Sequence, residues 1–172
     1  MQDIYDDMQR RGLIHDLIQI NTKDFNYNSI VELIEPYKDG NGSMIIFDDT
    51  MTELTPDFEQ VFTNLSHHQN CSIIYITQNL FYQDKTFRSM SLNAHYVIAM
   101  KNARDQQQFK IFSSQICPGN STYVVDAYRD ATKYPYSYLL LDFTQDSPSV
   151  LRLRSKIFPS EFPYTVYLEK TD

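Results

Sequence analysis

The feature that most constrains the fold is a series of short apolar runs, each closed by polar or turn residues. Five runs have the length of β-strands: MIIF (44–47), SIIYIT (72–77), HYVIAM (95–100), YLLLDF (138–143) and VLRLR (150–154). The first four are almost continuously apolar, which is typical of strands covered on both faces in a parallel sheet. The fifth alternates apolar and polar residues, which indicates a half-exposed or edge strand.

Segments with helical spacing separate these runs. In TPDFEQVFTNLSHH (55–68), Thr55 suits the N-cap and Pro56 suits the first helical position. The segments ARDQQQFKIFSSQI (103–116) and STYVVDAYRDATK (121–133) are further candidates, the latter with Ser121 or Thr122 near its cap. Strands that alternate with helices predict an α/β fold, with a mostly parallel sheet flanked by helices. We expect a single domain that spans residues 1–172.

The charge balance limits the partners. The formal net charge of −7 excludes a general attraction to nucleic acid or to an anionic membrane, so any DNA contact must be local. RLRSK (152–156) is the one compact basic cluster in the sequence, and a solvated strand edge is its more common meaning.

The remaining composition predicts an intracellular protein. Cys71 and Cys117 have no spacing that fits a disulfide framework or a zinc site, which favours reduced thiols. The polar, acidic start lacks the apolar segment of a signal peptide, and no apolar run reaches the roughly 18 residues of a membrane span. We therefore expect a protein of the cytoplasm or nucleus of a host cell, neither secreted nor bound to a membrane.

Two adjacent aspartates close the first apolar run. Asp48 and Asp49 follow MIIF, and Gln78 follows the next run. The carboxyl ends of neighbouring parallel strands meet at one edge of a sheet, where ligands bind. An acid pair there suits a nucleoside triphosphatase, in which the first carboxylate holds magnesium through water and the second orients the attacking water. For an isolated Asp-Asp pair, an Asx-type turn or a helix cap is the alternative.

Longer stretches of the chain carry a resemblance to a known family. MIIFDDTMTEL (44–54), LSHHQNCSIIYITQNLFYQDKTFRSMSLNAHYVIAMKNARDQQQ (65–108) and YPYSYLLLDF (134–143) resemble the later part of packaging-type ATPases of the FtsK/HerA branch of P-loop NTPases. Large DNA viruses and virus-like mobile elements carry such enzymes. The resemblance implies a partial RecA-like (ASCE) core, ATP and Mg²⁺ as cofactors, and double-stranded DNA and identical subunits of a ring as partners.

The resemblance also implies roles for individual residues. Asp48 would be the Walker B residue that holds magnesium, Asp49 the catalytic acid, and Gln78 the sensor on the adjacent strand. Arg104 falls where the family places an arginine finger that reaches a neighbouring subunit's nucleotide. Arg88 is a rival for that role, and for both arginines a solvated helix residue is the alternative.

The chain departs from the family at the phosphate loop. A P-loop enzyme needs G-x-x-x-x-G-K-[ST], and this sequence contains no such motif. The resemblance already begins at IYDDM (4–8), so we expect an amino-terminally truncated ATPase without the phosphate-loop strand.

The expected function is the carboxy-terminal part of a DNA-packaging or DNA-translocating ATPase, inactive alone. The alternative is a degenerate, non-enzymatic subunit or interaction module that binds no nucleotide. A metal-dependent nuclease built on Asp48 and Asp49 ranks last, because the sequence shows no further acids and lysine at a suitable spacing.

Overall fold

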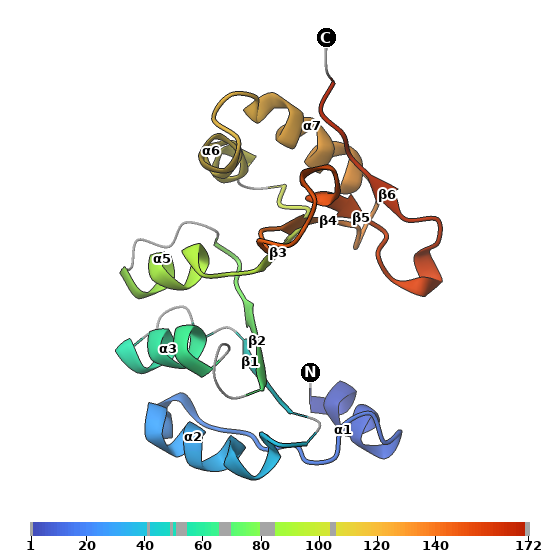
Figure 1. The fold of residues 1–172 in the computed structure, drawn as a ribbon. Coiled ribbons are helices and arrows are strands. Elements are labelled where there is room, and N and C mark those ends of the chain that lie inside the picture. Colours follow the sequence, from blue (N-terminus) through green and yellow to red (C-terminus); the bar gives the residue numbers. More distant parts are fainter. Residues whose placement is uncertain are drawn as a thin grey trace. The chain divides into compact units, whose positions relative to one another are not determined.

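The computed structural model (Figure 1) divides its contacts between two compact units, Met1–Thr77 and Gln78–Asp172. The sequence predicts one domain over residues 1–172, and the structure adds this internal division. The residues that the structure describes are 2–40, 42–48, 50, 55–65, 70–79, 85–103 and 106–170.

The first unit is a two-stranded parallel sheet with short helices. Its main elements are α1 (Gln2–Arg10), α2 (Tyr27–Ile34), β1 (Ser43–Asp48), α3 (Pro56–Gln60), the π-helical turn η3 (Val61–Leu65) and β2 (Cys71–Ile76). Two 3₁₀ turns, η1 (Thr22–Asp24) and η2 (Glu35–Tyr37), flank α2. β1 and β2 pair in register from Ser43 opposite Cys71 to Asp48 opposite Ile76. The parallel pairing predicted for these two strands is confirmed.

Helices cover one face of this parallel sheet. Phe47 of β1 is buried, and its ring centroid lies 5.5 Å from that of Phe25 and 4.8 Å from that of Phe58 on α3. On the opposite face Met44, Ile74 and Ile76 are exposed. The nearly continuous apolar pattern therefore does not mean burial on both faces here, because Phe25 and Phe58 pack on the Phe47 face and the side chains named on the other face stay exposed.

The second unit holds a four-stranded antiparallel sheet. Its elements are α5 (Lys85–Leu92), β3 (Tyr96–Met100), α6 (Gln106–Ile116), α7 (Ser121–Ala131), β4 (Tyr138–Asp142), η4 (Ser149–Leu151), β5 (Leu153–Ser155), η5 (Pro159–Glu161) and β6 (Thr165–Val166). The strand order is β3-β4-β5-β6, with every neighbouring pair antiparallel.

The mixed α/β class is confirmed, whereas a mostly parallel sheet is not observed. Between β3 and β4 the chain forms two helices, α6 and α7, instead of the single crossover helix of a β-α-β unit. β4, β5 and β6 then follow one another through short connections, which permit antiparallel pairing. β5 lies between β4 and β6, so of the two alternatives for VLRLR the edge position is wrong, whereas the partly exposed Arg154 between buried neighbours agrees with a half-exposed strand.

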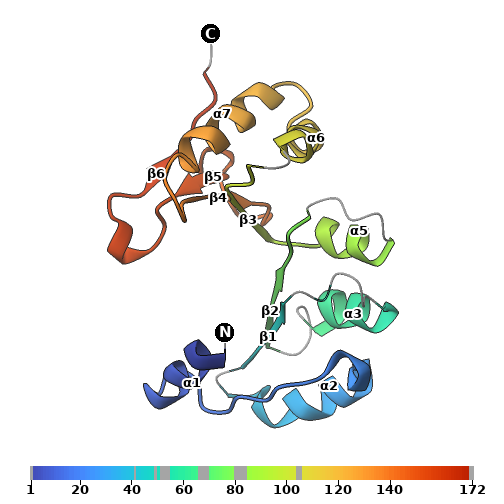
Figure 2. The ribbon, with the colours of Figure 1, turned by 180° about the vertical axis from the view of Figure 1, so that it is seen from behind.

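The core of the second unit lies between its sheet and the α6–α7 pair, which covers one face of the sheet (Figure 2). Leu139 and Leu141 of β4 are fully buried there, and every residue of β4 is buried, as its apolar run predicts. β3 differs, because alternate residues are exposed. The exposed side chains of β3 are Tyr96, Ile98 and Met100.

The predicted helix starts are close to the observed ones. Thr55 is the N-cap residue of α3 and Pro56 is its first residue. α7 begins at Ser121, one residue after its cap, Asn120, whose side chain accepts a hydrogen bond from the Tyr123 backbone N–H at 3.3 Å.

Candidate functional site

Asp48 is the last residue of β1 and is half-buried. Because successive side chains of a strand point to opposite faces, Asp48 shares the exposed face with Met44, opposite to the buried Phe47. Its register partner on β2 is Ile76. The carboxylate thus stands at the carboxyl end of a strand, on the face of the sheet where Met44 and Ile76 are exposed.

The neighbouring strand ends at the same edge. β1 and β2 are parallel and in register, so Ile76 and the following Thr77 lie beside the end of β1. This meeting of the two strand ends was predicted from the sequence and is confirmed. Gln78 is exposed and is the first residue of the second unit, so its predicted proximity to Asp48 stays a prediction.

A buried hydroxyl lies two residues after Asp48. Thr50 is 8% exposed, and in the described part of the chain its Oγ1 has no hydrogen-bond partner. A buried polar atom without a partner costs about 1–3 kcal/mol, so such an atom is usually satisfied by a ligand or water. The sequence analysis did not single out Thr50, although a hydroxyl so close to an acidic strand end is a recognisable signal.

These residues fit one kind of metal site. Mg²⁺ needs one or two carboxylates and completes its shell with water and phosphate oxygens. Asp48 offers a carboxylate and Thr50 an unpartnered hydroxyl. Among the described residues, no group of three or more His, Cys, Asp or Glu side chains converges as a metal site. Asp48 and Thr50 therefore fit a magnesium ion that arrives with a triphosphate.

The other candidates contribute less. Asp49 and Arg104 lie outside the described residues. Arg88 is an exposed residue of α5 in the second unit.

The predicted basic cluster RLRSK is partly used by the fold. Arg154 forms a salt bridge with the buried Asp142, with 2.5 Å between Arg154 Nη2 and Asp142 Oδ2. Burial alone would raise the pKa of Asp142, yet hydrogen bonds from Thr144 and Ser147 and the Arg154 charge hold it below its ordinary value. This arginine therefore stabilises the antiparallel sheet, which differs from the solvated strand edge that was expected for the cluster.

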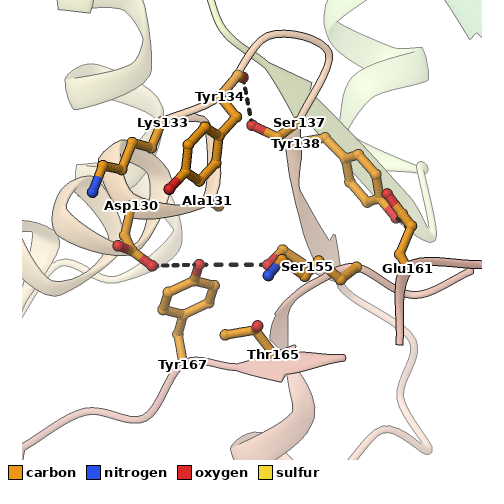
Figure 3. A pocket seen from close by; sticks show the side chains of 11 residues that line it. Asp130, Ala131, Lys133, Tyr134, Ser137, Tyr138, Ser155, Glu161, Thr165 and Tyr167 are labelled. Atoms are coloured by element: carbon orange, nitrogen blue, oxygen red, sulfur yellow. Dashed lines mark hydrogen bonds between the residues drawn. The ribbon is translucent and has the colours of Figure 1, made fainter. Parts of the chain in front are cut away.

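One cavity of the second unit, which we call the tyrosine cavity, has a volume of about 210 Å³ (Figure 3). Tyr167 donates a hydrogen bond to Asp130 at 2.9 Å, and Tyr138 donates one to Glu161 at 2.6 Å. Burial, followed by the effect of these carboxylates, raises the pKa of Tyr138 and of Tyr167. Both carboxylates are thus bonded to tyrosines that attach the C-terminal segment to the unit, which is a structural role.

A second cavity, which we call the basic cavity, has a volume of about 270 Å³. Four of its lining side chains are cationic: Lys101, Lys110, Arg129 and Lys133. Its floor consists of the buried residues Phe109, Tyr128 and Thr132. The four cationic residues could not be predicted as a group from the sequence, because they are spread from position 101 to position 133 and only the fold brings them together.

Among the helices that the structure describes, none has the length and apolar character needed to cross a membrane. Comparisons with protein-family models, with curated proteins and with solved structures give no match to this chain.

Proposed function

We propose that this chain is the carboxy-terminal part of a DNA-packaging or DNA-translocating ATPase. The single observation that carries the proposal is the parallel, in-register pair of β1 and β2, which places Asp48 at the edge where two strand ends meet. This edge is the usual ligand position of an open α/β sheet. The resemblance of the flanking sequence to packaging-type ATPases supplies the reaction class.

In this proposal each residue at the edge has one task. Asp48 holds the water shell of the magnesium ion that accompanies ATP. The Thr50 hydroxyl either donates a hydrogen bond to a water of that shell or takes the place of one of these waters. Asp49 orients the attacking water, and Gln78 contacts the γ-phosphate side of the site. Magnesium supplies neutralisation of the phosphate charge. Arg104, or Arg88 in its place, contacts the nucleotide of a neighbouring subunit in a ring.

Hydrolysis also needs a phosphate-binding loop, and the sequence contains no G-x-x-x-x-G-K-[ST]. Among the described strands β2 pairs only with β1, so its second edge is open to a further strand. We propose that a strand bearing the phosphate loop pairs there. The same lack of a loop favours the second candidate, a degenerate subunit or interaction module that binds no nucleotide.

The test compares two forms of the protein. The 172-residue chain should show no magnesium-dependent ATP turnover above buffer. A longer form that adds the preceding coding sequence should contain the phosphate loop within about a hundred residues, a span of ordinary domain size, and should hydrolyse ATP. Turnover should be lost in Asp48→Asn and Asp49→Asn and kept in the matched control Asp39→Asn, which removes an exposed carboxylate of the same unit.

The outcomes separate the candidates. A preceding sequence without the loop motif, or equal turnover in Asp48→Asn and Asp39→Asn, would overturn the ATPase proposal. No ATP binding by the longer form, with or without Asp48→Asn, would leave the non-enzymatic subunit as the function. Robust Asp49-dependent turnover by the 172-residue chain would show that the phosphates are bound without the added loop.

A further inference from the structure

We infer that the basic cavity binds the phosphate group of a phosphate ester. The cavity belongs to the second unit and is lined by the residues that follow β3, by α6, and by the last turns of α7 with the two residues after them. None of its described lining residues is assigned to ATP hydrolysis, so this inference does not rest on the proposed function.

The lining of the basic cavity carries positive charge. Among the described lining residues there are four cationic side chains and no carboxylate, in a chain whose formal net charge is −7. Arg129 pairs with Asp126 at 3.4 Å, but both side chains are largely exposed, so the pair is weak. The described residues form no salt bridge with Lys101, Lys110 or Lys133. The neighbouring acid on α7, Asp130, accepts its hydrogen bond from Tyr167.

The helix dipole explains only part of this group. Arg129 lies in the last turn of α7 and Lys133 follows its end, where cations are favourable. Lys110 lies in the first half of α6, and Lys101 lies in the connection before that helix. The dipole does not favour cations at these two positions, so an anion between the four side chains is the simpler reason for their grouping.

The buried residues beneath the basic cavity are held in place by ring stacking and hydrogen bonds. The rings of Phe109 and Tyr128 stack with 3.9 Å between centroids. The Tyr128 hydroxyl accepts a hydrogen bond from the Asn102 backbone N–H at 2.9 Å and donates one to the Met100 carbonyl at 3.0 Å. The backbone on both sides of Lys101 is therefore attached to α7. A pre-ordered site loses less entropy when a ligand binds.

The volume and the donor groups of the basic cavity fit a phosphate ester. A volume of about 270 Å³ accommodates a phosphate and the adjoining sugar, and it is below the size of a typical cofactor pocket. Lysine binds phosphate as a point charge, and arginine binds it through paired N–H groups. Asn102 and Gln106 add amide groups to the lining. The ester can belong to a nucleic-acid backbone or to a free nucleotide, and the experiment separates these two sources.

The experiment measures binding to the full chain in two arms. One arm uses fluorescence anisotropy with a labelled DNA duplex at several salt concentrations, and the other uses calorimetry with AMP and with inorganic phosphate. The double variant Lys101→Gln/Lys110→Gln should lose about tenfold in affinity and reduce the DNA salt slope by about two, roughly one for each phosphate contact. Lys101→Arg/Lys110→Arg should keep the binding.

The matched control is Lys85→Gln/Lys170→Gln, which removes the same charge from exposed positions of the second unit outside the cavity. It should change the affinity less than twofold. Loss in the duplex arm alone assigns the site to a nucleic-acid backbone, and loss in the AMP and phosphate arm assigns it to a free phosphate ester. Equal losses in the two glutamine variants, or no binding in either arm, would overturn the inference whatever the outcome for ATP hydrolysis.

Discussion

The Tyr128 hydroxyl gives the sharpest stability prediction, because its removal changes one atom in a buried position. Tyr128→Phe keeps the ring that stacks on Phe109 and deletes two hydrogen bonds, one from the Asn102 N–H and one to the Met100 carbonyl. A hydrogen bond contributes about 0.5–1.5 kcal/mol net, so the two together predict a loss of about 1–3 kcal/mol in the free energy of unfolding. The side chain is 7% exposed, so water replaces the hydroxyl poorly.

Urea unfolding followed by far-ultraviolet circular dichroism measures this loss, and Tyr136→Phe is the matched control. Tyr136 is 89% exposed, and its variant should lie within about 0.5 kcal/mol of the parent. Hydrogen exchange supplies a local readout, since the Asn102 amide should exchange faster in Tyr128→Phe. Equal stability of the two variants, together with unchanged exchange at Asn102, would refute the bridging role of Tyr128.

Three further predictions concern burial and ionisation. Leu139→Ala should lower the free energy of unfolding by about 2–5 kcal/mol, because Leu139 is fully buried, whereas Leu168→Ala at an exposed position should change it little in the same urea titration. The folded-state pKa of Asp142 is below its ordinary value of 3.8, so its carboxylate stabilises the fold above that pH and the contribution is lost as the pH falls through the folded pKa. Asp142→Asn should therefore be less stable than the parent at pH 7, and the difference should shrink at pH 3; a constant difference would contradict this assignment. Burial raises the pKa of the Cys71 thiol to about 11, so a thiol reagent at pH 8 should label the half-buried Cys117 first, and prior labelling of Cys71 would contradict its burial.

Local sequence signals predicted several elements of the fold, although α1, α2, α5 and β6 were not among them. Thr55 and Pro56 marked the start of α3, and the apolar run YLLLDF predicted the fully buried β4. These signals work because capping, backbone restriction and side-chain periodicity act over a few neighbouring residues.

The pairing of strands was harder to predict. Apolar runs of the same kind form the parallel β1–β2 pair and the antiparallel β3–β4 pair. Composition says that a strand has apolar neighbours, but the path of the chain between strands decides their direction. The two helices between β3 and β4 changed the outcome expected for a single crossover helix.

The candidate site residues also differ in whether the sequence could predict them. Asp48 was predictable because the acid and the strand that carries it are adjacent in sequence, and the shared edge of β1 and β2 followed from their parallel pairing. The basic cavity was not predictable, because Lys101 and Lys133 come together only after α6 and α7 have folded onto the sheet. The basic run that the sequence does show, RLRSK, contributes no residue to this cavity, and its Arg154 forms a salt bridge with Asp142.

The net charge of −7 and a phosphate-binding cavity are compatible for a physical reason. At physiological ionic strength the Debye length is about 8 Å, so acids farther than that from a bound phosphate are largely screened. The phosphate responds mainly to the four cations around it, while the overall charge governs long-range attraction. DNA should therefore associate slowly with the basic cavity, because the overall charge does not attract it from a distance. Its affinity should still depend on Lys101 and Lys110. Lowering the salt concentration extends the reach of the distant acids, so the affinity for DNA should rise less steeply than four phosphate contacts would give.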